Sequence, residues 1–220
     1  MDGEAWVIFA AGDWCEAPLI NRFVTAATNI LACDGALDRC REWGVHPTHV
    51  IGDMDSATQE ALEAFTAQGG QLIQRMDQDQ HDLSKALSYA NENGATSCIV
   101  FGATGGDEQH TWANLLSCAV TAMEIICVSS DLTYRFFRPG TSYSIECQPG
   151  SAFSLFALPE AKKIVLSGAK YPLKHSTMAM GSQGLHNECV ERTLQLSFGE
   201  GRLMMLHPHA SVSVEDVNGA

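Results

Sequence analysis

The sequence predicts a Rossmann-like α/β region with a mainly parallel sheet over residues 1–130, followed by an antiparallel β-sandwich over residues 131–220. Three observations predict this fold class. Short apolar runs alternate with helical patterns along the first 130 residues. Those runs are apolar on both faces, as in parallel strands that helices cover on both sides. After Ser130 the rhythm changes to short strand-like runs separated by turns such as PG and GEG.

The elements of the α/β region follow one another in a regular order. We expect strands at 6–12, 29–35, 48–56 with its exit loop, 71–76, 97–103 and 124–130. Between them we expect a helix from Pro18, a short helix ending near Gly44, and helices at 57–68, 82–92 and 110–123. Over 82–92, for example, apolar residues recur at the three- and four-residue spacing of one helical face.

The second region reads as strands throughout. Its runs are YRFF, TSYSIEC, AFSLFAL, KKIVLSGA, TLQLSF, RLMML and SVSV. No helical face of useful length lies between them, so we expect an antiparallel sandwich or roll.

Composition excludes some classes of partner. The 220 residues include 45% hydrophobic and 18% charged residues, an ordinary globular balance, with a formal net charge of −13. So acidic a surface argues against a nucleic-acid backbone or an anionic membrane as the main partner. No apolar run approaches the ~18 residues that a membrane span needs. A small phosphorylated ligand stays possible, because a metal ion can supply positive charge.

The eight cysteines indicate a reducing compartment. None stands in a C-x-x-C pair, and several lie inside apolar runs such as ILAC and SCIVF. We therefore expect reduced, buried thiols and a cytoplasmic protein, without a disulfide framework or a zinc site. The N-terminal stretch also lacks the basic region of a signal peptide.

Acidic residues follow the expected strands at the points where they end. Asp34, Asp53, Asp55, Asp77, Asp79 and Asp82 all occupy such positions. Because the carboxyl ends of parallel strands meet at one edge of a sheet, residues far apart in sequence should converge there. That edge is where open α/β sheets bind ligands.

Within this set, three aspartates could hold a cation. Residues two apart in an extended stretch point the same way, so Asp53 and Asp55 should aim at one spot. With Asp82 at the start of the next helix, they offer the hard oxygen ligands that suit Mg²⁺. The alternative is that Asp55 or Ser56 caps the helix at 57–68 and Asp82 caps its own. Because several acidic residues lie on one edge of the sheet, we favour a metal site over separate capping roles.

The segment GATGG at 102–106 lets a backbone approach a phosphate, with a helix N-terminus directly after it. By itself, His110 is expected to do no more than open that helix. Lys85 lies on the same side of its helix as Asp82, where it could reach a phosphate or balance that carboxylate.

These motifs resemble the thiamine pyrophosphokinase family. The matching stretches are ACDGA, VIGDMDS, DQDQHDLSKAL and GATGG…HTWANL, then GSAFSLFAL, GAKYPL and LHNECVERTLQLSFGEGRLMML. The resemblance implies a homodimer with the thiamine site between subunits. It also implies transfer of the terminal diphosphate of ATP to the thiamine hydroxyl, giving thiamine diphosphate and AMP.

The resemblance also implies roles for single residues. The Mg²⁺-coordinating, catalytic acids would be Asp53, Asp55 and Asp82. The residues at the nucleotide would be Asp34, Gly35, Ser56, Lys85, Gly105, Gly106, His110 and Thr111. The residues at thiamine would be Gln78, Tyr171, His186 and Asn187, with Tyr171 stacked on the cationic ring.

Four positions depart from the family pattern. Asp107 replaces an arginine, Gln109 an aspartate, His186 a serine and Ala36 a glycine. Asp107 and His186 motivate one alternative, a diphosphotransferase acting on another hydroxymethyl heterocycle such as a pterin. The lost arginine motivates another, a non-catalytic thiamine-binding module. A dinucleotide oxidoreductase is disfavoured, because the first strand runs into AAGDWCEAP and lacks G-x-G-x-x-G.

Overall fold

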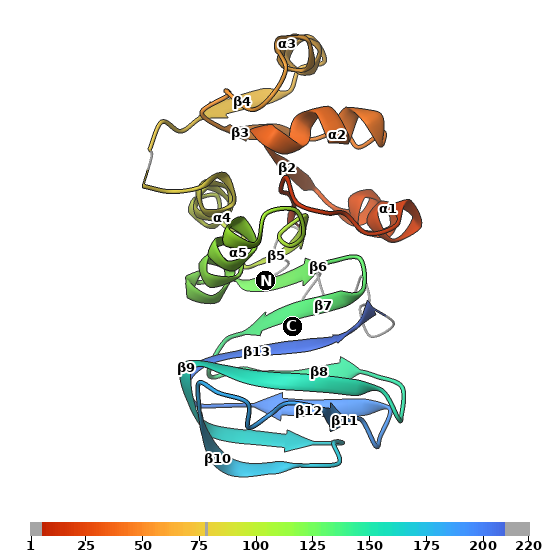
Figure 1. The fold of residues 1–220 in the computed structure, drawn as a ribbon, viewed down its shortest axis with the longest axis vertical. Coiled ribbons are helices and arrows are strands. Elements are labelled where there is room, and N and C mark those ends of the chain that lie inside the picture. The colour runs from red at the N-terminus through yellow and green to blue at the C-terminus, as the bar shows by residue number, and fades with distance from the viewer. Residues whose placement is uncertain (1–5, 78, 210–220) are drawn as a thin grey trace.

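The structure is a computed structural model that describes residues 6–77 and 79–209. Its strands form one continuous hydrogen-bonded path in the order β4-β3-β2-β1-β5-β6-β7-β13-β9-β12-β8, with β10 and β11 paired to β9. Figure 1 shows helices packed around the first part of this path and strands alone in the second part. We call residues 6–128 the α/β part and residues 132–208 the β part.

The α/β part alternates strands and helices as the sequence predicts. Its elements are β1 (Trp6–Phe9), α1 (Ala17–Ala26), β2 (Asn29–Cys33), the 3-10 turn η1 (Asp34–Ala36), α2 (Leu37–Glu42), β3 (His49–Gly52), α3 (Gln59–Ala67), β4 (Gln71–Gln74), α4 (Asp82–Glu92), β5 (Ser97–Phe101), α5 (Glu108–Val120) and β6 (Glu124–Val128). The strands β4-β3-β2-β1-β5-β6 are all parallel. The expected doubly covered parallel sheet is therefore confirmed.

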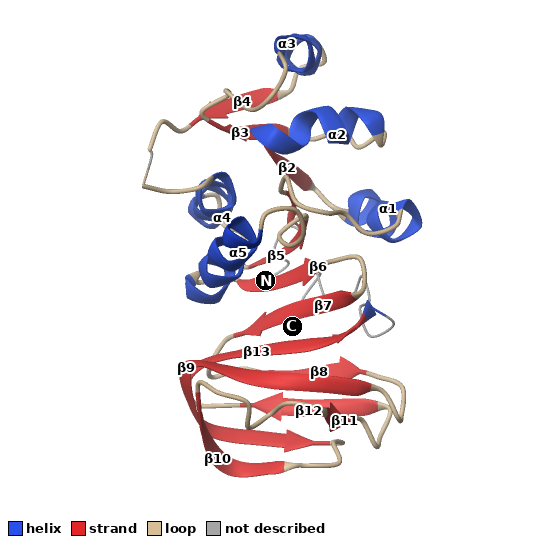
Figure 2. Cartoon of the chain, viewed as in Figure 1, coloured by secondary structure: helices blue, strands red, loops and turns tan. Residues whose placement is uncertain are grey.

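Helices cover both faces of this sheet (Figure 2). On one face, side chains of α1, α2 and α3 pack with Phe9 and Phe101, and Phe23 of α1 lies within this cluster. On the other face, α4 and α5 pack over Ile8 and Ile125. β4 is the exception to the buried pattern, because it is the edge strand and is mostly exposed.

The β part is antiparallel and contains β7 (Leu132–Phe137), β8 (Ser142–Glu146), β9 (Ala152–Ser167), β10 (Leu173–Ala179), β11 (Asn187–Glu188), β12 (Thr193–Ser197) and β13 (Glu200–Pro208). The long β9 pairs with β13 at residues 154–157 and with β12 at 165–167. Alternate side chains of these strands turn inward and form a separate hydrophobic core around Phe137, Leu155 and Leu203. The predicted sandwich is confirmed.

Three details of the β part differ from the prediction. The runs expected as two strands, AFSLFAL and KKIVLSGA, form the single strand β9. Strands β10 and β11 were not predicted, because β10 carries mostly polar side chains and β11 spans only two residues. The expected strand SVSV lies outside the described residues.

The two parts meet where the sheet changes direction. β6 pairs antiparallel with β7, so the parallel ladder passes directly into the antiparallel one. Two guanidinium groups of the β part reach the last turn of α5: Arg138 donates to Thr121 O at 2.9 Å, and Arg202 donates to Thr121 O at 2.9 Å and Val120 O at 3.1 Å. Cations there satisfy free carbonyls and oppose the negative end of the helix dipole.

The described part of the chain agrees with the cysteine expectation. All eight cysteines are free thiols, and seven are buried while Cys147 is partly exposed. Among the described helices, none is long and apolar enough to cross a membrane.

Candidate functional site

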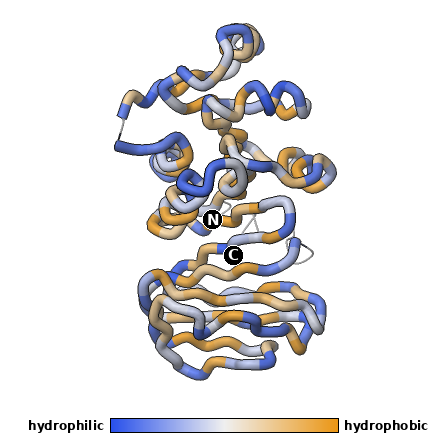
Figure 3. Tube along the Cα trace, in the orientation of Figure 1, coloured by the Kyte–Doolittle hydropathy of each residue, from blue (hydrophilic) through white to orange (hydrophobic). Residues whose placement is uncertain are grey.

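A pocket of about 500 Å³ opens at the carboxyl ends of the parallel strands. It is lined by the loops after β1, β3, β4 and β5, by the last residue of β2 and by the N-terminal halves of α4 and α5. The lining residues are Ala10, Ala11, Gly12, Cys33, Asp53, Asp77, Gln80, His81, Asp82, Leu83, Lys85, Gly105, Gly106, Asp107, His110 and Asn114. Between β4 and α4, the chain on either side of residue 78 is mostly hydrophilic, with Met76 as the apolar exception (Figure 3).

The turn after β3 presents the acidic pair. Met54 lies between Asp53 and Asp55 with φ of 71°, a left-handed conformation that is strained for a non-glycine residue. Asp34 holds this turn, because its Oδ2 accepts the Met54 N–H at 2.8 Å while Oδ1 accepts the Gly35 N–H at 2.7 Å. Asp53 and Asp55 thus converge through a braced turn and not through the extended strand that we expected.

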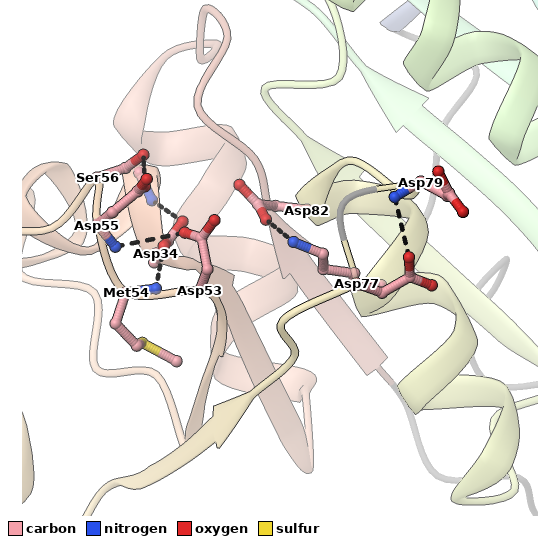
Figure 4. Close-up of polar contacts among 10 residues, drawn as sticks. Asp34, Asp53, Met54, Asp55, Ser56, Asp77, Asp79 and Asp82 are labelled. Atoms are coloured by element: carbon pink, nitrogen blue, oxygen red, sulfur yellow. Dashed lines mark hydrogen bonds and ion pairs between the residues drawn. The ribbon is translucent and has the colours of Figure 1, made fainter.

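Three carboxylates form the group that could hold a metal ion. Asp34, Asp53 and Asp55 each place one oxygen within 4.8 Å of the others. Figure 4 shows these side chains gathered at one turn, with Asp82 approaching from α4. Asp82 is not one of these three, but its charge acts on Asp34, so its expected role as a further ligand stays a prediction. Three hard oxygen donors at this spacing fit Mg²⁺.

The close packing around Asp34 has two consequences. A Cβ on Gly52 would lie 2.4 Å from Asp34 Cγ, so only glycine leaves room for the carboxyl group there. Burial, and then the negative charge of Asp82, raise the pKa of Asp34 to about 6. A divalent cation at the group would reverse this effect by favouring the ionised form.

Lys85 pairs with Asp82 beside the group. Its Nζ donates to Asp82 Oδ1 at 3.1 Å, and its side chain is only 6% exposed. Burial disfavours its charged form, but the hydrogen bond and charge of Asp82, with the further carboxylates nearby, outweigh burial and raise the pKa of Lys85. A buried ammonium group therefore lies at the wall of an otherwise acidic pocket.

The helix caps differ from the alternative that we considered. Thr58 caps α3, with its Oγ1 accepting the Ala61 N–H at 3.3 Å, so neither Asp55 nor Ser56 is the cap. His81 is the N-cap residue of α4 and Asp82 is its first helical residue. Ser56 instead donates its hydroxyl to Asp55 Oδ1 at 3.1 Å. Asp55, Ser56 and Asp82 are thus free of capping roles.

Asp107 does cap a helix. Its Oδ1 accepts the backbone N–H groups of Gln109 at 2.8 Å and His110 at 2.9 Å at the start of α5. The helix N-terminus that we expected to face a phosphate is therefore filled by a carboxylate of the chain itself. Thr111 N donates to Asp107 O in the same turn, and the His110 side chain is exposed at the pocket.

The glycine turn after β5 lies against the loop after β1. Gly12 N donates to Gly102 O at 2.9 Å, and a Cβ on Gly12 would lie 2.4 Å from Thr104 O. Gly105 has φ of 85° and packs on the Asp13 side chain. Sequence reasoning missed Gly12, Gln80, His81 and Asn114 as lining residues. The signal available for Gly12 was its position directly after the first strand.

A second, smaller pocket of about 120 Å³ lies in the β part. It is lined by Leu155, Leu166, Tyr171, Leu173, Met178, Gln183, Gly184, Leu185 and Asn187. The Tyr171 side chain is 63% exposed, and Asn187 is buried. His186 is exposed and has φ of 54°. Of the residues that the resemblance implies for thiamine, Gln78 lies outside the described residues.

Two family models match the chain, one in each of its two parts. The model of the thiamin pyrophosphokinase catalytic domain matches residues 20–127, and the model of its vitamin B1 binding domain matches residues 142–203. The chain belongs to the thiamin pyrophosphokinase family. This is a family of ATP-dependent diphosphotransferases.

Individual relatives agree with this assignment. The chain is 29% identical over 171 residues to the thiamine pyrophosphokinase of Bacillus subtilis (strain 168), covering 74% of this chain and 79% of that one. The crystal structure of thiamine pyrophosphokinase from Bacillus subtilis has a TM-score of 0.76 at 23% identity, over 92% of this chain and 98% of that chain. The yeast thiamin pyrophosphokinase structure has a TM-score of 0.72 at 12% identity, over 98% of this chain and 89% of that chain.

Candidate site residues occur in both matched ranges. The acidic turn, Lys85 and the glycine turn fall within the range of the catalytic model, and Tyr171, His186 and Asn187 fall within the range of the vitamin B1 binding model. The pterin alternative and the non-catalytic alternative receive no support from these comparisons.

Proposed function

We propose that this chain transfers the terminal diphosphate of ATP to the hydroxyl group of thiamine, releasing AMP. The single observation that carries this proposal is the group of Asp34, Asp53 and Asp55 in the region that matches the catalytic model. Residues 1–130 would hold ATP and residues 131–220 would hold thiamine. The reduced thiols and the thiamine pyrophosphokinase assignment support a cytoplasmic enzyme.

In this proposal Mg²⁺ would be held by Asp34, Asp53 and Asp55 together with Asp82. When bound, Mg²⁺ would supply positive charge that neutralises the phosphates, including the negative charge that develops as the bond to AMP breaks. Asp34 keeps the Met54 turn in place, so the carboxylates of Asp53 and Asp55 stay on one side. Lys85 positions Asp82 and offers its ammonium group to a phosphate.

The reaction would be an in-line displacement. The thiamine oxygen attacks the β-phosphorus, the bond between this phosphorus and the oxygen bridging to the α-phosphorus breaks, and AMP leaves with that oxygen. The hydroxyl proton passes to one of the aspartates or to water. Because phosphoryl transfer depends mainly on positioning and charge, the site needs no strong base.

A second copy of the chain would complete this site. The acidic pocket lies at the strand ends of the α/β part, and the Tyr171 pocket is lined in part by Leu173 and Met178 of β10. Figure 1 shows β10 at the end of the molecule opposite α3 and β4. Direct transfer needs both substrates in contact, so the two pockets would meet across a homodimer. Exposed apolar residues at helical spacing on α5, namely Trp112, Leu116 and Val120, support such an interface.

A coupled assay for AMP tests the proposed reaction. The purified chain is incubated with thiamine, ATP and Mg²⁺, and AMP should appear in amounts that depend on thiamine. Asp53→Ala should lower the rate by orders of magnitude while the far-ultraviolet circular dichroism spectrum stays that of the unchanged protein. Absence of AMP above background at micromolar enzyme would contradict the proposal. Sedimentation should give twice the chain mass.

A further inference from the structure

The large pocket carries an unusual balance of charge for a site that receives a polyphosphate. Four of its lining residues are aspartates, Asp53, Asp77, Asp82 and Asp107. Its one lining lysine, Lys85, already pairs with Asp82. Like charges that line one pocket repel each other, and the repulsion grows as water is excluded. A ligand with several negative charges therefore meets net repulsion unless it brings positive charge with it.

Asp107 disfavours binding of a polyphosphate in two ways. First, its carboxylate occupies the Gln109 and His110 N–H groups, the free donors of a helix N-terminus that could otherwise meet a phosphate. Second, it adds a fixed negative charge beside Gly105 and Gly106. The hydrogen bonds from His110 and Gln109 lower the pKa of Asp107, so the residue stays ionised at neutral pH.

We propose that Asp107 makes this pocket selective for a nucleotide polyphosphate that arrives as its divalent-metal complex and weakens binding of the metal-free form. The inference rests on the proposed function, because it assumes that the pocket receives ATP. A divalent cation cancels two charges of the polyphosphate, so the complex meets less repulsion from Asp107 than the free nucleotide does. Asp107 is thus a specificity-determining residue for the charge state of the nucleotide.

If Asp107 acted only as the cap of α5, a variant that keeps the cap would bind the nucleotide as the unchanged protein does. Asparagine is as good an N-cap residue as aspartate, so Asp107→Asn keeps the acceptor for α5 and removes only the charge. The matched control is Glu108→Gln. Glu108 is exposed, is the first residue of α5 and does not line the pocket, so this variant removes one charge nearby and leaves the cap in place.

Calorimetric titration with ADP separates these roles, because ADP binds without turnover. The unchanged protein, Asp107→Asn and Glu108→Gln are each titrated at low ionic strength, once with a chelator and once with Mg²⁺. We expect Asp107→Asn to bind metal-free ADP roughly fivefold to tenfold more tightly and Mg²⁺–ADP less than about threefold more tightly. Glu108→Gln should change both affinities by less than about twofold.

Two results would overturn the inference while leaving the proposed function intact. One is equal affinity of Asp107→Asn and the unchanged protein for metal-free ADP. The other is a gain in affinity for metal-free ADP in Glu108→Gln that equals the gain in Asp107→Asn. That result would assign the effect to net charge alone. If the unchanged protein and Asp107→Asn both fail to bind ADP even with Mg²⁺, the proposed function fails, and the inference fails with it.

Discussion

The side-chain amide of Asn187 bonds to both backbone groups of Tyr171. Its Oδ1 accepts the Tyr171 N–H at 3.1 Å, and its Nδ2 donates to the Tyr171 carbonyl at 3.0 Å. Oδ1 also accepts the Glu188 N–H at 2.9 Å. A buried amide whose donor and acceptor are both used in this way holds the exposed Tyr171 ring in place and has little capacity left for a ligand.

Asn187 should therefore act on thiamine through Tyr171. We expect Asn187→Ala to raise KM for thiamine roughly tenfold, because it leaves the Tyr171 backbone unpaired, and to change kcat and KM for ATP by less than about threefold. Steady-state kinetics of AMP release measures this split. Asn187→Asp keeps the acceptor oxygen but loses the donor, so its KM for thiamine should lie between those of the unchanged protein and Asn187→Ala. The matched control is Lys170→Ala, which breaks only an exposed ion pair with Glu188.

How far the sequence could predict this molecule depends on the kind of contact involved. The alternation of strands and helices follows from local hydrophobic periodicity, and α4 begins and ends at the residues expected from Leu83, Ala86 and Leu87. Strand β10 escaped prediction because an edge strand with polar side chains carries no such pattern.

The site shows the same division. That Asp34, Asp53 and Asp55 lie together follows from topology, since parallel strands end at one edge. That Asp34 is held in the group depends on one hydrogen bond to Met54, and the position of Asp82 beside the group depends on one ion pair with Lys85. Neither contact leaves a periodic signal in the sequence. The capping role of Asp107 likewise became apparent only from the geometry of α5.

Gly52→Ala should disable the acidic turn. The new Cβ would lie 2.4 Å from Asp34 Cγ, so the carboxyl group must move and release the Met54 N–H. We expect a loss of activity of roughly tenfold to a hundredfold and a higher Mg²⁺ concentration for half-maximal rate. AMP assays across a Mg²⁺ series measure both effects.

The control for this variant is Gly94→Ala, where the glycine has φ of 88° and a Cβ would meet no atom within 4 Å. It should cost about 1 kcal/mol in the free energy of unfolding and leave the Mg²⁺ dependence unchanged. A Gly52→Ala protein with unchanged Mg²⁺ dependence would contradict the role assigned to Asp34.

Thr58→Ala should affect stability and not chemistry. Thr58 Oγ1 accepts the Ala61 N–H at 3.3 Å and donates to Asp38 Oδ1 at 2.7 Å, so its loss removes the cap of α3 and a link to α2. We expect the free energy of unfolding to fall by about 1 kcal/mol in urea titrations. Ser56→Ala should change it by less than about 0.5 kcal/mol. An equal loss in both variants would show that the cap assignment is wrong.

His49 should make stability depend on pH. The imidazole stacks on Trp6 with ring centroids 6.4 Å apart and lies 5.7 Å from the Tyr89 ring, and burial lowers its pKa from 6.5. The unfolded chain therefore binds a proton on His49 at a higher pH than the folded chain does. By linkage, stability rises with pH between the folded pKa and 6.5, and it falls as pH is lowered through this window.

Urea titrations from pH 5 to 7.5 test this dependence in the unchanged protein and in His49→Phe. Phenylalanine keeps an aromatic ring against Trp6 and Tyr89 but cannot bind a proton, so the variant should lose part of the slope below pH 6.5. The part that remains includes His81, whose pKa burial also lowers. A proton resonance titration of the His49 ring should give a midpoint below 6.5. A midpoint above 6.5, or an unchanged slope in His49→Phe, would contradict the argument.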